Sequence, residues 1–368
     1  MRPGTLRKVE CDSCGVVANA SHFSEQEVLT LYGDEYALNT SGAEEHLFFT
    51  KDGPIARSEV FCQWIAPHFF SGPQRALEIG SGQGNLLARL SETLPQAKFS
   101  GIEGSHRAAE LARSRGLDVR QGLVTGNTEL PAAETIFSVN VLEHIEDIDG
   151  FLATIRRSLA ASDAEPSAQR LVLCLPIQNY YGYDLFFLEH VWHFTVDHVQ
   201  QLLGRRGFKV LHCEHQHPIN HGIGLFVCQP LDDSVDNGAS VDGDYPWIRN
   251  NRDRWHRVFA EVNTWLETQP ADAKIAVFGG GEVFALFRAF TRLGERRVVA
   301  CIDEDPAKVD QTIESDGHNI IVGNIEWLRK NPVDALLLTL NPKYHGMVKD
   351  KLASVVDRVF SWSPYDPK

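Results

Sequence analysis

Between residues 75 and 228, short runs of apolar residues alternate with longer segments in which apolar residues recur every three or four positions. The runs are typical of buried strands, and the longer segments are typical of amphipathic helices. We expect strands at residues 76–79, 99–103, 118–121, 135–140, 171–175, 209–212 and 224–227. Helices are expected at 84–92, 107–114, 148–159 and 196–205. This alternation predicts an α/β fold with a doubly wound, Rossmann-like core.

The pattern changes after residue 228. Residues 229–244 are rich in Asp, Ser, Gly and Asn, which is typical of an exposed connection, and an amphipathic helix is expected at 247–267. Strands at 275–278, 298–302 and 336–340 and a helix at 283–293 predict a second, smaller Rossmann-like domain. We therefore divide the chain into a short N-terminal segment (1–50), the core (51–228), an acidic linker and helix (229–270) and a C-terminal Rossmann-like substrate domain (271–368).

Composition places the chain among ordinary globular proteins, because 43% of its 368 residues are apolar and 23% are charged. It has no apolar run long enough to span a bilayer. The net charge of −14 disfavours nucleic acid as a partner, because binding it needs clustered basic residues. No apolar segment of the secretory kind follows the basic N-terminus, and seven cysteines, an odd number, indicate free thiols in a reducing compartment. We expect a cytoplasmic protein with no membrane partner.

The first strand of the core leads into the segment Glu78-Ile79-Gly80-Ser81-Gly82-Gln83-Gly84. Glycines at every second position before a helix are typical of a turn whose backbone approaches a ligand closely. A dinucleotide fingerprint would have its third glycine at position 85, which is Asn85. Glu103 ends the second strand, where a carboxylate can accept both hydroxyls of a ribose, and Glu78 can orient a cationic amino-acid group. A glycine-rich turn without function is the alternative.

These residues resemble the class I methyltransferases, which use S-adenosyl-L-methionine. The segment Val119-Arg120-Gln121-Gly122 is similar to the end of that family's third strand, near the adenine. Residues 138–145 are similar to the end of its fourth strand, next to the methyl group. The resemblance implies that S-adenosyl-L-methionine is the cofactor. The residues expected to hold it are Glu78, Gly80, Ser81, Gly82, Gly84, Glu103, Gly122 and Asn140.

Two later segments resemble the three-part sugar C-methyltransferases that act on nucleotide-linked keto-sugars. Residues 184–190 are similar to that family's Asp-x-Ile-Tyr-His-Glu-His segment, and residues 220–225 to its Thr-His-Gly-Gly-Ser-Leu segment. Gly279-Gly280-Gly281 and Asp303 match its C-terminal Gly-rich turn and acidic strand end. The resemblance implies a small-molecule sugar or nucleotide-sugar substrate. The residues expected to contact it are Tyr32, Tyr36, Tyr183, His193, His221 and Gly281.

Methylation of a carbon next to a ketone needs a base that removes a weakly acidic proton. A histidine steadied by a carboxylate suits this task, and Glu189 with His190 is the expected pair. His144, at the end of the fourth strand, could polarise the substrate oxygen or relay the proton. A histidine without such a motif is more often structural, which is our interpretation of His212, His215 and His217.

The chain also departs from the sugar C-methyltransferases. Phe187 stands where that family has Tyr, and His193 stands where it often has Tyr. Both differences leave open O-methyl transfer to a glycan or small natural product. Family members hold zinc with two Cys-x-x-Cys pairs, but this chain has only Cys11 and Cys14. Zinc bound by Cys11 and Cys14 is therefore kept as the less favoured alternative, and His22, His46 and Cys62 could complete such a site. Phe284 disfavours NAD at the C-terminal turn. A non-catalytic, nucleotide-binding assembly partner is the alternative from another class.

Overall fold

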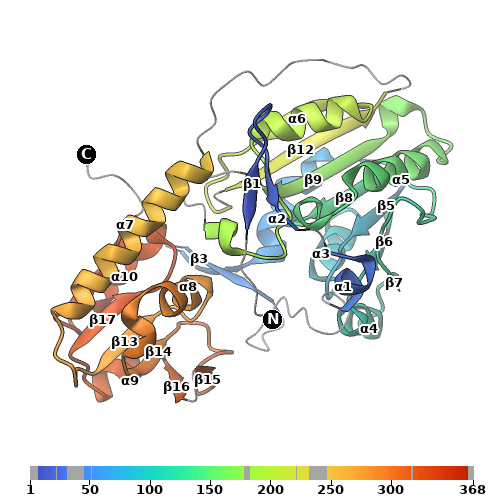
Figure 1. The fold of residues 1–368 in the computed structure, drawn as a ribbon. Helices are drawn as coiled ribbons and strands as arrows, with labels where there is room; N and C mark the ends of the chain where they lie inside the picture. Colours follow the sequence, from blue (N-terminus) through green and yellow to red (C-terminus); the bar gives the residue numbers. More distant parts are fainter. Residues whose placement is uncertain are drawn as a thin grey trace. The chain divides into compact units, whose positions relative to one another are not determined.

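The computed structural model describes residues 7–21, 23–30, 45–50, 52–177, 183–220, 222–231, 247–315 and 318–363. The described residues form two compact units, and Figure 1 shows each as an α/β body. The first unit takes the described residues up to 231, and the second takes those from 247 onward.

A seven-stranded sheet forms the centre of the first unit. Its order is β11-β12-β9-β8-β5-β6-β7. The strands are β5 (Gln74–Ile79), β6 (Ala97–Glu103), β7 (Val119–Gln121), β8 (Thr135–Val139), β9 (Arg170–Pro176), β11 (Phe208–Glu214) and β12 (Ile223–Pro230). The strands from β9 to β7 are parallel, whereas β12 runs antiparallel to both β9 and β11. All seven predicted strands are present, with ends within a few residues of expectation.

Helices cover both faces of this sheet because the buried strands are apolar on both sides. On one face, Leu77 packs in a core with α5 (Ile148–Ala160) and α6 (Val196–Arg205). On the other face, Ala76 packs with α2 (Arg57–Ile65), α3 (Asn85–Thr93) and α4 (His106–Ser114). Side chains of adjacent residues alternate between the two cores, as the period of a strand requires. The prediction of a doubly wound, Rossmann-like core is confirmed.

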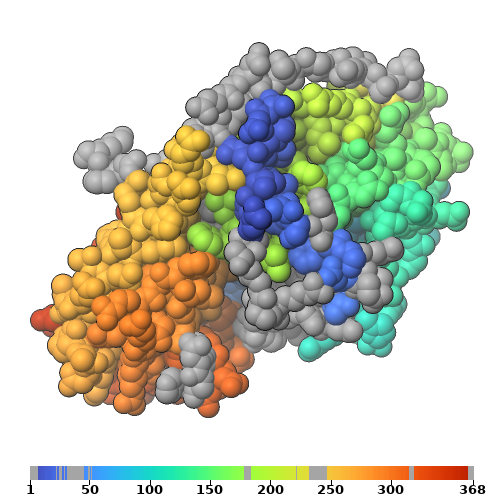
Figure 2. Space-filling view, viewed as in Figure 1, coloured from blue at the N-terminus to red at the C-terminus, as the bar shows by residue number. Residues whose placement is uncertain are grey.

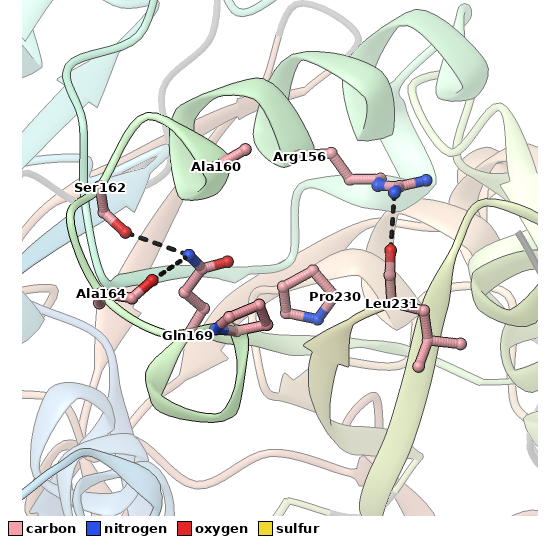
Figure 3. Close-up of a pocket in the computed structure, with 8 residues that line it drawn as sticks. Arg156, Ala160, Ser162, Ala164, Gln169, Pro230 and Leu231 are labelled. Atoms are coloured by element: carbon pink, nitrogen blue, oxygen red, sulfur yellow. Dashed lines mark hydrogen bonds between the residues drawn. The ribbon is translucent and has the colours of Figure 1, made fainter. Parts of the chain in front are cut away.

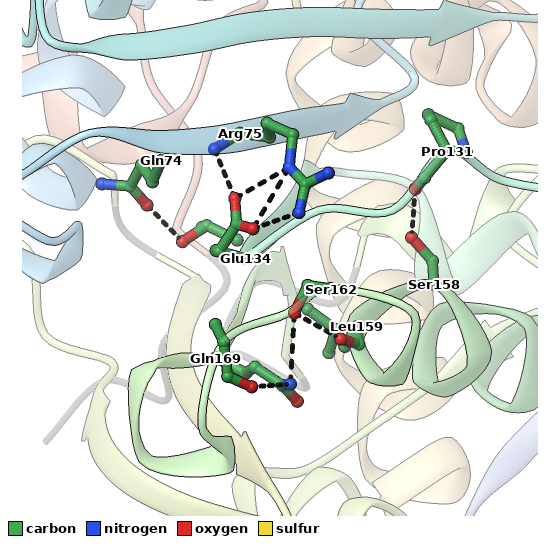
Figure 4. A network of polar contacts seen from close by, with 10 residues as sticks. Gln74, Arg75, Pro131, Glu134, Ser158, Leu159, Ser162 and Gln169 are labelled. Carbon is green, nitrogen blue, oxygen red and sulfur yellow. Dashed lines mark hydrogen bonds and ion pairs between the residues drawn. The ribbon is translucent and has the colours of Figure 1, made fainter.

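Polar contacts join the amino ends of the central strands, as Figure 4 shows. Arg75 of β5 forms an ion pair with Glu134, which directly precedes β8. The Thr135 hydroxyl, which is fully buried, donates to Gln74 Oε1 at 2.6 Å. These contacts satisfy polar groups at the edge of the sheet opposite to the Gly-rich turn, so this edge is structural.

The N-terminal hairpin is hydrogen-bonded into the first unit. Strands β1 (Lys8–Glu10) and β2 (Val17–Asn19) form a three-stranded sheet with β10 (Trp192–His193). His198 of α6 donates from Nε2 to the Cys14 carbonyl oxygen. Figure 2 shows the hairpin in blue on the surface of this unit. The remaining elements of this part are α1 (Glu25–Thr30), β3 (Leu47–Thr50) and β4 (Gly53–Ala56).

The second unit contains a smaller sheet with the order β15-β16-β14-β13-β17-β18. The strands are β13 (Ile275–Phe278), β14 (Val298–Ile302), β15 (Thr312–Ser315), β16 (His318–Gly323), β17 (Ala335–Leu338) and β18 (Val359–Phe360). The helices are α7 (Trp247–Glu267), α8 (Glu282–Phe290), α9 (Ile325–Lys330) and α10 (His345–Leu352). The β13 strand lies between β14 and β17 and is parallel to both, which is the Rossmann-like arrangement that the sequence predicts.

Candidate active site

The turn after β5 is built from three glycines with positive φ angles, Gly80 (76°), Gly82 (53°) and Gly84 (80°). The amide nitrogens of Gly80 and Ser81 both donate to the Ile102 carbonyl oxygen of β6, at 2.8 and 3.2 Å. A Cβ atom added to Gly80 would lie 2.5 Å from Val141 Cγ2. The turn is therefore held tightly against the ends of β6 and β8, and α3 begins directly after it.

Glu103 ends β6 and is fixed by backbone donors of two turns. Its Oε2 accepts from the Gly82 amide and its Oε1 from the Ser105 amide, both at 2.7 Å. Burial raises the pKa of Glu103, while these amides oppose the rise. Each carboxylate oxygen keeps a lone pair beyond these bonds, and the predicted use of that lone pair is to accept a ribose hydroxyl.

Glu78 is buried at the end of β5, with only 3% of its surface exposed. Burial raises the pKa of Glu78 to about 8, the neighbouring Glu103 adds to the rise, and Arg57 opposes it. A buried carboxyl group of this kind needs a cationic or hydrogen-bonding partner to remain ionised. The ammonium group of an amino acid is such a partner.

Several buried oxygens around the turn have no hydrogen-bond partner within the described ranges. They are Glu78 Oε2, Ser81 Oγ, Gln83 Oε1 and Asn140 Oδ1. Buried polar atoms are normally satisfied, so such a group of unsatisfied acceptors and hydroxyls fits a polar ligand. The ammonium, ribose hydroxyls and adenine amine of S-adenosyl-L-methionine offer donors of the required kind.

The other two expected cofactor residues also lie at the carboxyl edge of the sheet. The Gly122 amide, directly after β7, donates to the Glu103 carbonyl oxygen at 2.8 Å. Asn140 follows β8 with φ 55°, a backbone conformation that side chains other than glycine rarely adopt. Its amide donates to the Cys174 carbonyl oxygen at 2.8 Å. The strained residue lies beside the turn, where a ligand would approach.

His144 lies in a short 3-10 helix, Leu142–His144, that directly follows Asn140 and Val141. Its Nδ1 is 2.9 Å from the Glu189 carbonyl oxygen, so the neutral ring carries its proton on Nδ1 and has a lone pair on Nε2. Burial lowers the pKa of His144 to about 4, and the bond to Glu189 opposes the fall. The Nε2 atom lies 3.6 Å from Glu143 Oε1. Burial raises the pKa of Glu143 to about 8, so the pair is neutral at pH 7.

The carboxylate that faces His190 and His193 is Asp184. Asp184 Oδ2 lies 3.0 Å from His193 Nδ1 and 4.0 Å from His190 Nδ1. Burial lowers the pKa of both histidines. The rings of His190 and His144 meet edge to face, with centroids 4.9 Å apart. The three histidines of the expected site are therefore close together.

Among the described residues, Glu189 and His190 form neither a hydrogen bond nor an ion pair with each other. Its carbonyl oxygen accepts from His144, and its carboxylate favours the charged form of Lys8. The Lys8 ammonium donates to the carbonyl oxygens of Phe187 and His190, at 3.0 and 2.7 Å. Within this loop the carboxylate beside the histidines thus comes from Asp184, six residues before His190 in the same motif.

The remaining expected residues have different positions. Tyr32, Tyr36 and His221 lie outside the described residues, as does the side chain of Tyr183. Gly281 directly precedes α8 in the second unit, where an added Cβ would meet open space. Cys11 and Cys14 are free thiols in the turn of the N-terminal hairpin.

Cys62 is one of the residues that the sequence offered to complete a zinc site with Cys11 and Cys14. The Cys62 sulfur lies 3.4 Å from Thr93 Oγ1, between α2 and α3. In the described part of the chain, two groups of three residues could hold a metal ion. They are Glu143, His144 and His190, and Asp184, His190 and His193, and neither group includes a cysteine.

Sequence reasoning did not select Asp184, Glu143 or Arg57 as site residues. Asp184 and Glu143 stand inside motifs that the sequence singles out, so their position was a usable signal. Arg57, the first residue of α2, opposes the rise of the pKa of both Glu78 and Glu143. No motif marks Arg57, and only the tertiary structure brings it near these carboxyl groups.

A separate cavity of about 390 Å³ opens beside the amino end of β9, as Figure 3 shows. The Gln169 side-chain amide donates to Ser162 Oγ and to the Ala164 carbonyl oxygen, and Arg156 donates to the Leu231 carbonyl oxygen. These polar groups are satisfied by the protein, and the cavity lies away from the carboxyl edge where the expected cofactor residues gather. We assign it no ligand.

Residues 77–162 match the family model described as "Methyltransferase domain". The matched residues include the Gly-rich turn, Glu103, Asn140 and His144, and they span the sheet from β8 through β5 and β6 to the edge strand β7. Residues 77–162, within the Rossmann-like sheet of the first unit, are therefore similar to a methyltransferase domain.

Among curated proteins, the chain is similar to a trans-aconitate 2-methyltransferase of Rhodococcus jostii (strain RHA1). The two are 32% identical over 91 residues, which cover 25% of this chain and 36% of that protein. The chain thus matches about a third of the length of this relative.

None of the described helices is both long and apolar enough to cross a membrane.

Solved structures of methyltransferases are also similar. An S-adenosylmethionine-dependent methyltransferase from Mesorhizobium loti is 16% identical, with a TM-score of 0.38, and the match covers 46% of this chain and 97% of that one. The mitomycin 7-O-methyltransferase is 21% identical, with a TM-score of 0.39, and the match covers 47% of this chain and 53% of that one.

Proposed function

We propose that this protein is a methyltransferase that moves a methyl group from S-adenosyl-L-methionine to a sugar, in the nucleotide-linked form, at a carbon next to a ketone. The observation that carries the proposal is the meeting of two features at one edge of the sheet. The Gly-rich turn with its unsatisfied acceptors lies there, and so does the group of three neutral histidines that follows β8 and β9.

The residues of the turn have distinct tasks in this proposal. S-adenosyl-L-methionine supplies an electrophilic methyl group on a sulfonium centre. Glu78 binds the ammonium group of its amino-acid part, and Glu103 accepts the ribose hydroxyls. Gly80 and Gly82 adopt the positive φ angles that the turn requires, and a side chain at Gly80 would collide with Val141. Gly122 and Asn140 border the adenine and the methyl group.

His144 is the base in this proposal. The sequence favours His190 with Glu189, but the contacts favour His144, because the Glu189 carbonyl holds its Nδ1 proton and thereby fixes the tautomer whose basic nitrogen is Nε2. His144 Nε2 takes the proton from the carbon next to the ketone. The electrons of that C–H bond would form an enolate, and S-adenosyl-L-methionine would supply the methyl group to its carbon and leave as S-adenosylhomocysteine when the methyl–sulfur bond breaks. His190, whose ring contacts that of His144, lies beside the oxygen that becomes negative.

The sugar part of the proposal depends on the motif at residues 184–190 and on the polar character of the acceptor side. Asp184, His190 and His193 present carboxylate and imidazole groups suited to hydroxyl and carbonyl oxygens. We propose the second unit as the substrate-binding domain, on the basis of its Gly279–Gly281 turn and Asp303.

Calorimetric titration with S-adenosylhomocysteine, alone and with a panel of nucleoside diphosphates and nucleotide sugars, tests this proposal. Binding of S-adenosylhomocysteine together with one nucleotide supports a sugar-nucleotide substrate and identifies its base. Binding of S-adenosylhomocysteine without any nucleotide contradicts the nucleotide-linked acceptor. Failure to bind S-adenosylhomocysteine contradicts the methyltransferase itself.

Transfer to an oxygen is the second candidate, and Phe187 favours it. Phe187 stands where the resembling family has a tyrosine, and its ring meets His190 edge to face with centroids 5.1 Å apart. No phenol at that position can therefore assist an enolate. Wash-out of deuterium from the carbon next to the ketone, without methyl transfer, separates the two candidates because only C-methylation needs enolisation. His144→Gln abolishes the wash-out in our proposal, whereas His106→Gln, on the exposed surface of α4, leaves it unchanged.

A further inference from the structure

Residues 184–193, which lie before α6, bring two histidines and a carboxylate close together. We call Asp184, His190 and His193 the loop triad. Each offers one ligand atom, and the three atoms lie within 4.8 Å of one another. Two imidazoles and one carboxylate form a ligand set that first-row divalent metals use, with coordination positions left open for a substrate.

The distances in the loop triad fit a single ion. Asp184 Oδ2 lies 3.0 Å from His193 Nδ1 and 4.0 Å from His190 Nδ1. Two ligand atoms that bind one ion at about 2.1 Å lie about 3.0–3.4 Å apart, and the two observed distances bracket that range. The distance to His190 is too long for a hydrogen bond, so the two atoms are near each other without being bonded.

Unsatisfied ligand atoms point to a missing partner. Across the described chain, neither His190 Nδ1 nor Asp184 Oδ1 has a hydrogen-bond partner. The side chains of Asp184 and His190 are each only 13% exposed. Buried polar atoms without partners are rare in native proteins and often mark the position of an ion or a ligand.

The loop is held in place by groups other than the triad. Lys8 donates to the carbonyl oxygens of Phe187 and His190, and Asn19 donates to the Leu188 carbonyl oxygen at 2.9 Å. The pairing of β10 with β2 fixes His193 opposite Val17. The ammonium of Lys8 donates to backbone oxygens, although its charge also acts on Asp184, and these contacts hold the residues of the loop triad near one another.

We propose that Asp184, His190 and His193 bind a first-row divalent transition metal ion such as Zn²⁺, which polarises the oxygen of the methyl acceptor. The inference deepens the proposed function and rests on it for the role of the ion, although binding of the ion can be measured by itself. The ion stabilises the negative oxygen that forms when His144 takes the proton. His193, which replaces a tyrosine of the resembling family, completes the ligand set.

Binding of Co²⁺ tests the loop triad directly, because protein-bound Co²⁺ absorbs visible light. The experiment uses the full chain with Cys11→Ser and Cys14→Ser, so that these thiols cannot contribute. We expect one Co²⁺ per chain, displaced by Zn²⁺. Asp184→Asn and His193→Asn, made separately, should each weaken Co²⁺ binding by at least about 10- to 100-fold, the loss that even an outer partner of a metal site causes.

His106→Gln is the matched control, because His106 also faces a carboxylate, Glu110 at 3.8 Å, but on the exposed surface of α4. Its Co²⁺ binding should equal that of the parent. S-adenosylhomocysteine binding by every variant shows that the protein is folded. Absence of bound Co²⁺ in a parent that binds S-adenosylhomocysteine overturns the metal site and leaves the methyltransferase proposal intact. Equal Co²⁺ affinity in Asp184→Asn, His193→Asn and the control overturns it as well.

Discussion

Replacement of Glu78 by Gln should stabilise the ligand-free protein at alkaline pH and weaken its binding of S-adenosylhomocysteine. Glu78 is 3% exposed, and burial raises its pKa from 4.5 to about 8. Folding therefore favours the protonated carboxyl group. The penalty for ionised Glu78 begins above pH 4.5, grows as the pH rises and is complete above about pH 8.

The size of this penalty follows from the pKa. A rise from 4.5 to about 8 corresponds to at most about 5 kcal/mol for the ionised form, and we expect about 2–3 kcal/mol after local relaxation. In a unit of this size 1 kcal/mol shifts the melting temperature by about 2–4 °C, so the variant should melt about 5–10 °C above the parent at pH 8–9. Near pH 4.5 the two should melt together.

Thermal melts of both proteins between pH 4.5 and 9, with and without S-adenosylhomocysteine, measure this difference. Glu110→Gln is the control, because that side chain is 67% exposed, and its melting temperature should follow that of the parent at every pH. With S-adenosylhomocysteine the order should reverse, because only ionised Glu78 attracts the ammonium group. A difference that does not depend on pH, or a variant that binds the ligand as well as the parent, would refute the reasoning.

Three further predictions concern the same edge of the sheet. Gly80→Ala should destabilise the protein by about 1–3 kcal/mol in denaturant titration and abolish S-adenosylhomocysteine binding, because the added Cβ would lie 2.5 Å from Val141. Gly116→Ala is the control and should retain binding, because Gly116 has a similar φ of 82° but an added Cβ there would meet no neighbouring atom. Glu103→Gln should weaken S-adenosylhomocysteine binding by calorimetry about 10-fold or more through loss of charge-assisted bonds, and unchanged affinity would contradict its assignment to the ribose. Lys8→Met should lower the rate of methyl transfer, because Lys8 donates to the carbonyl oxygens of Phe187 and His190. The affinity for S-adenosylhomocysteine should stay within about twofold of the parent's. An unchanged rate would show that Lys8 does not position the histidines.

The sequence alone determined the strands, the helices and the Gly-rich turn. Apolar runs of period two and helices of period 3.6 are local patterns, so the strands around Glu78 and Glu103 and the helix at 247–267 could be predicted from neighbouring residues. The Gly-rich turn could be predicted as well, because its positive φ angles favour glycine and the glycines are visible in the sequence.

Only the tertiary structure decided which side chains meet. The sequence places Glu189 beside His190, but adjacent residues of a loop need not face each other, and the fold turns the Glu189 carbonyl toward His144. Asp184 instead reaches His190 and His193, and Lys8 reaches the same loop from a hairpin about 180 residues away, as its hydrogen bonds show. Arg57 opposes the rise of the pKa of Glu78 and of the buried Glu143. It can do so only because the fold brings these three residues near one another. Pairing across such separations depends on sheet order and packing, which no local pattern encodes.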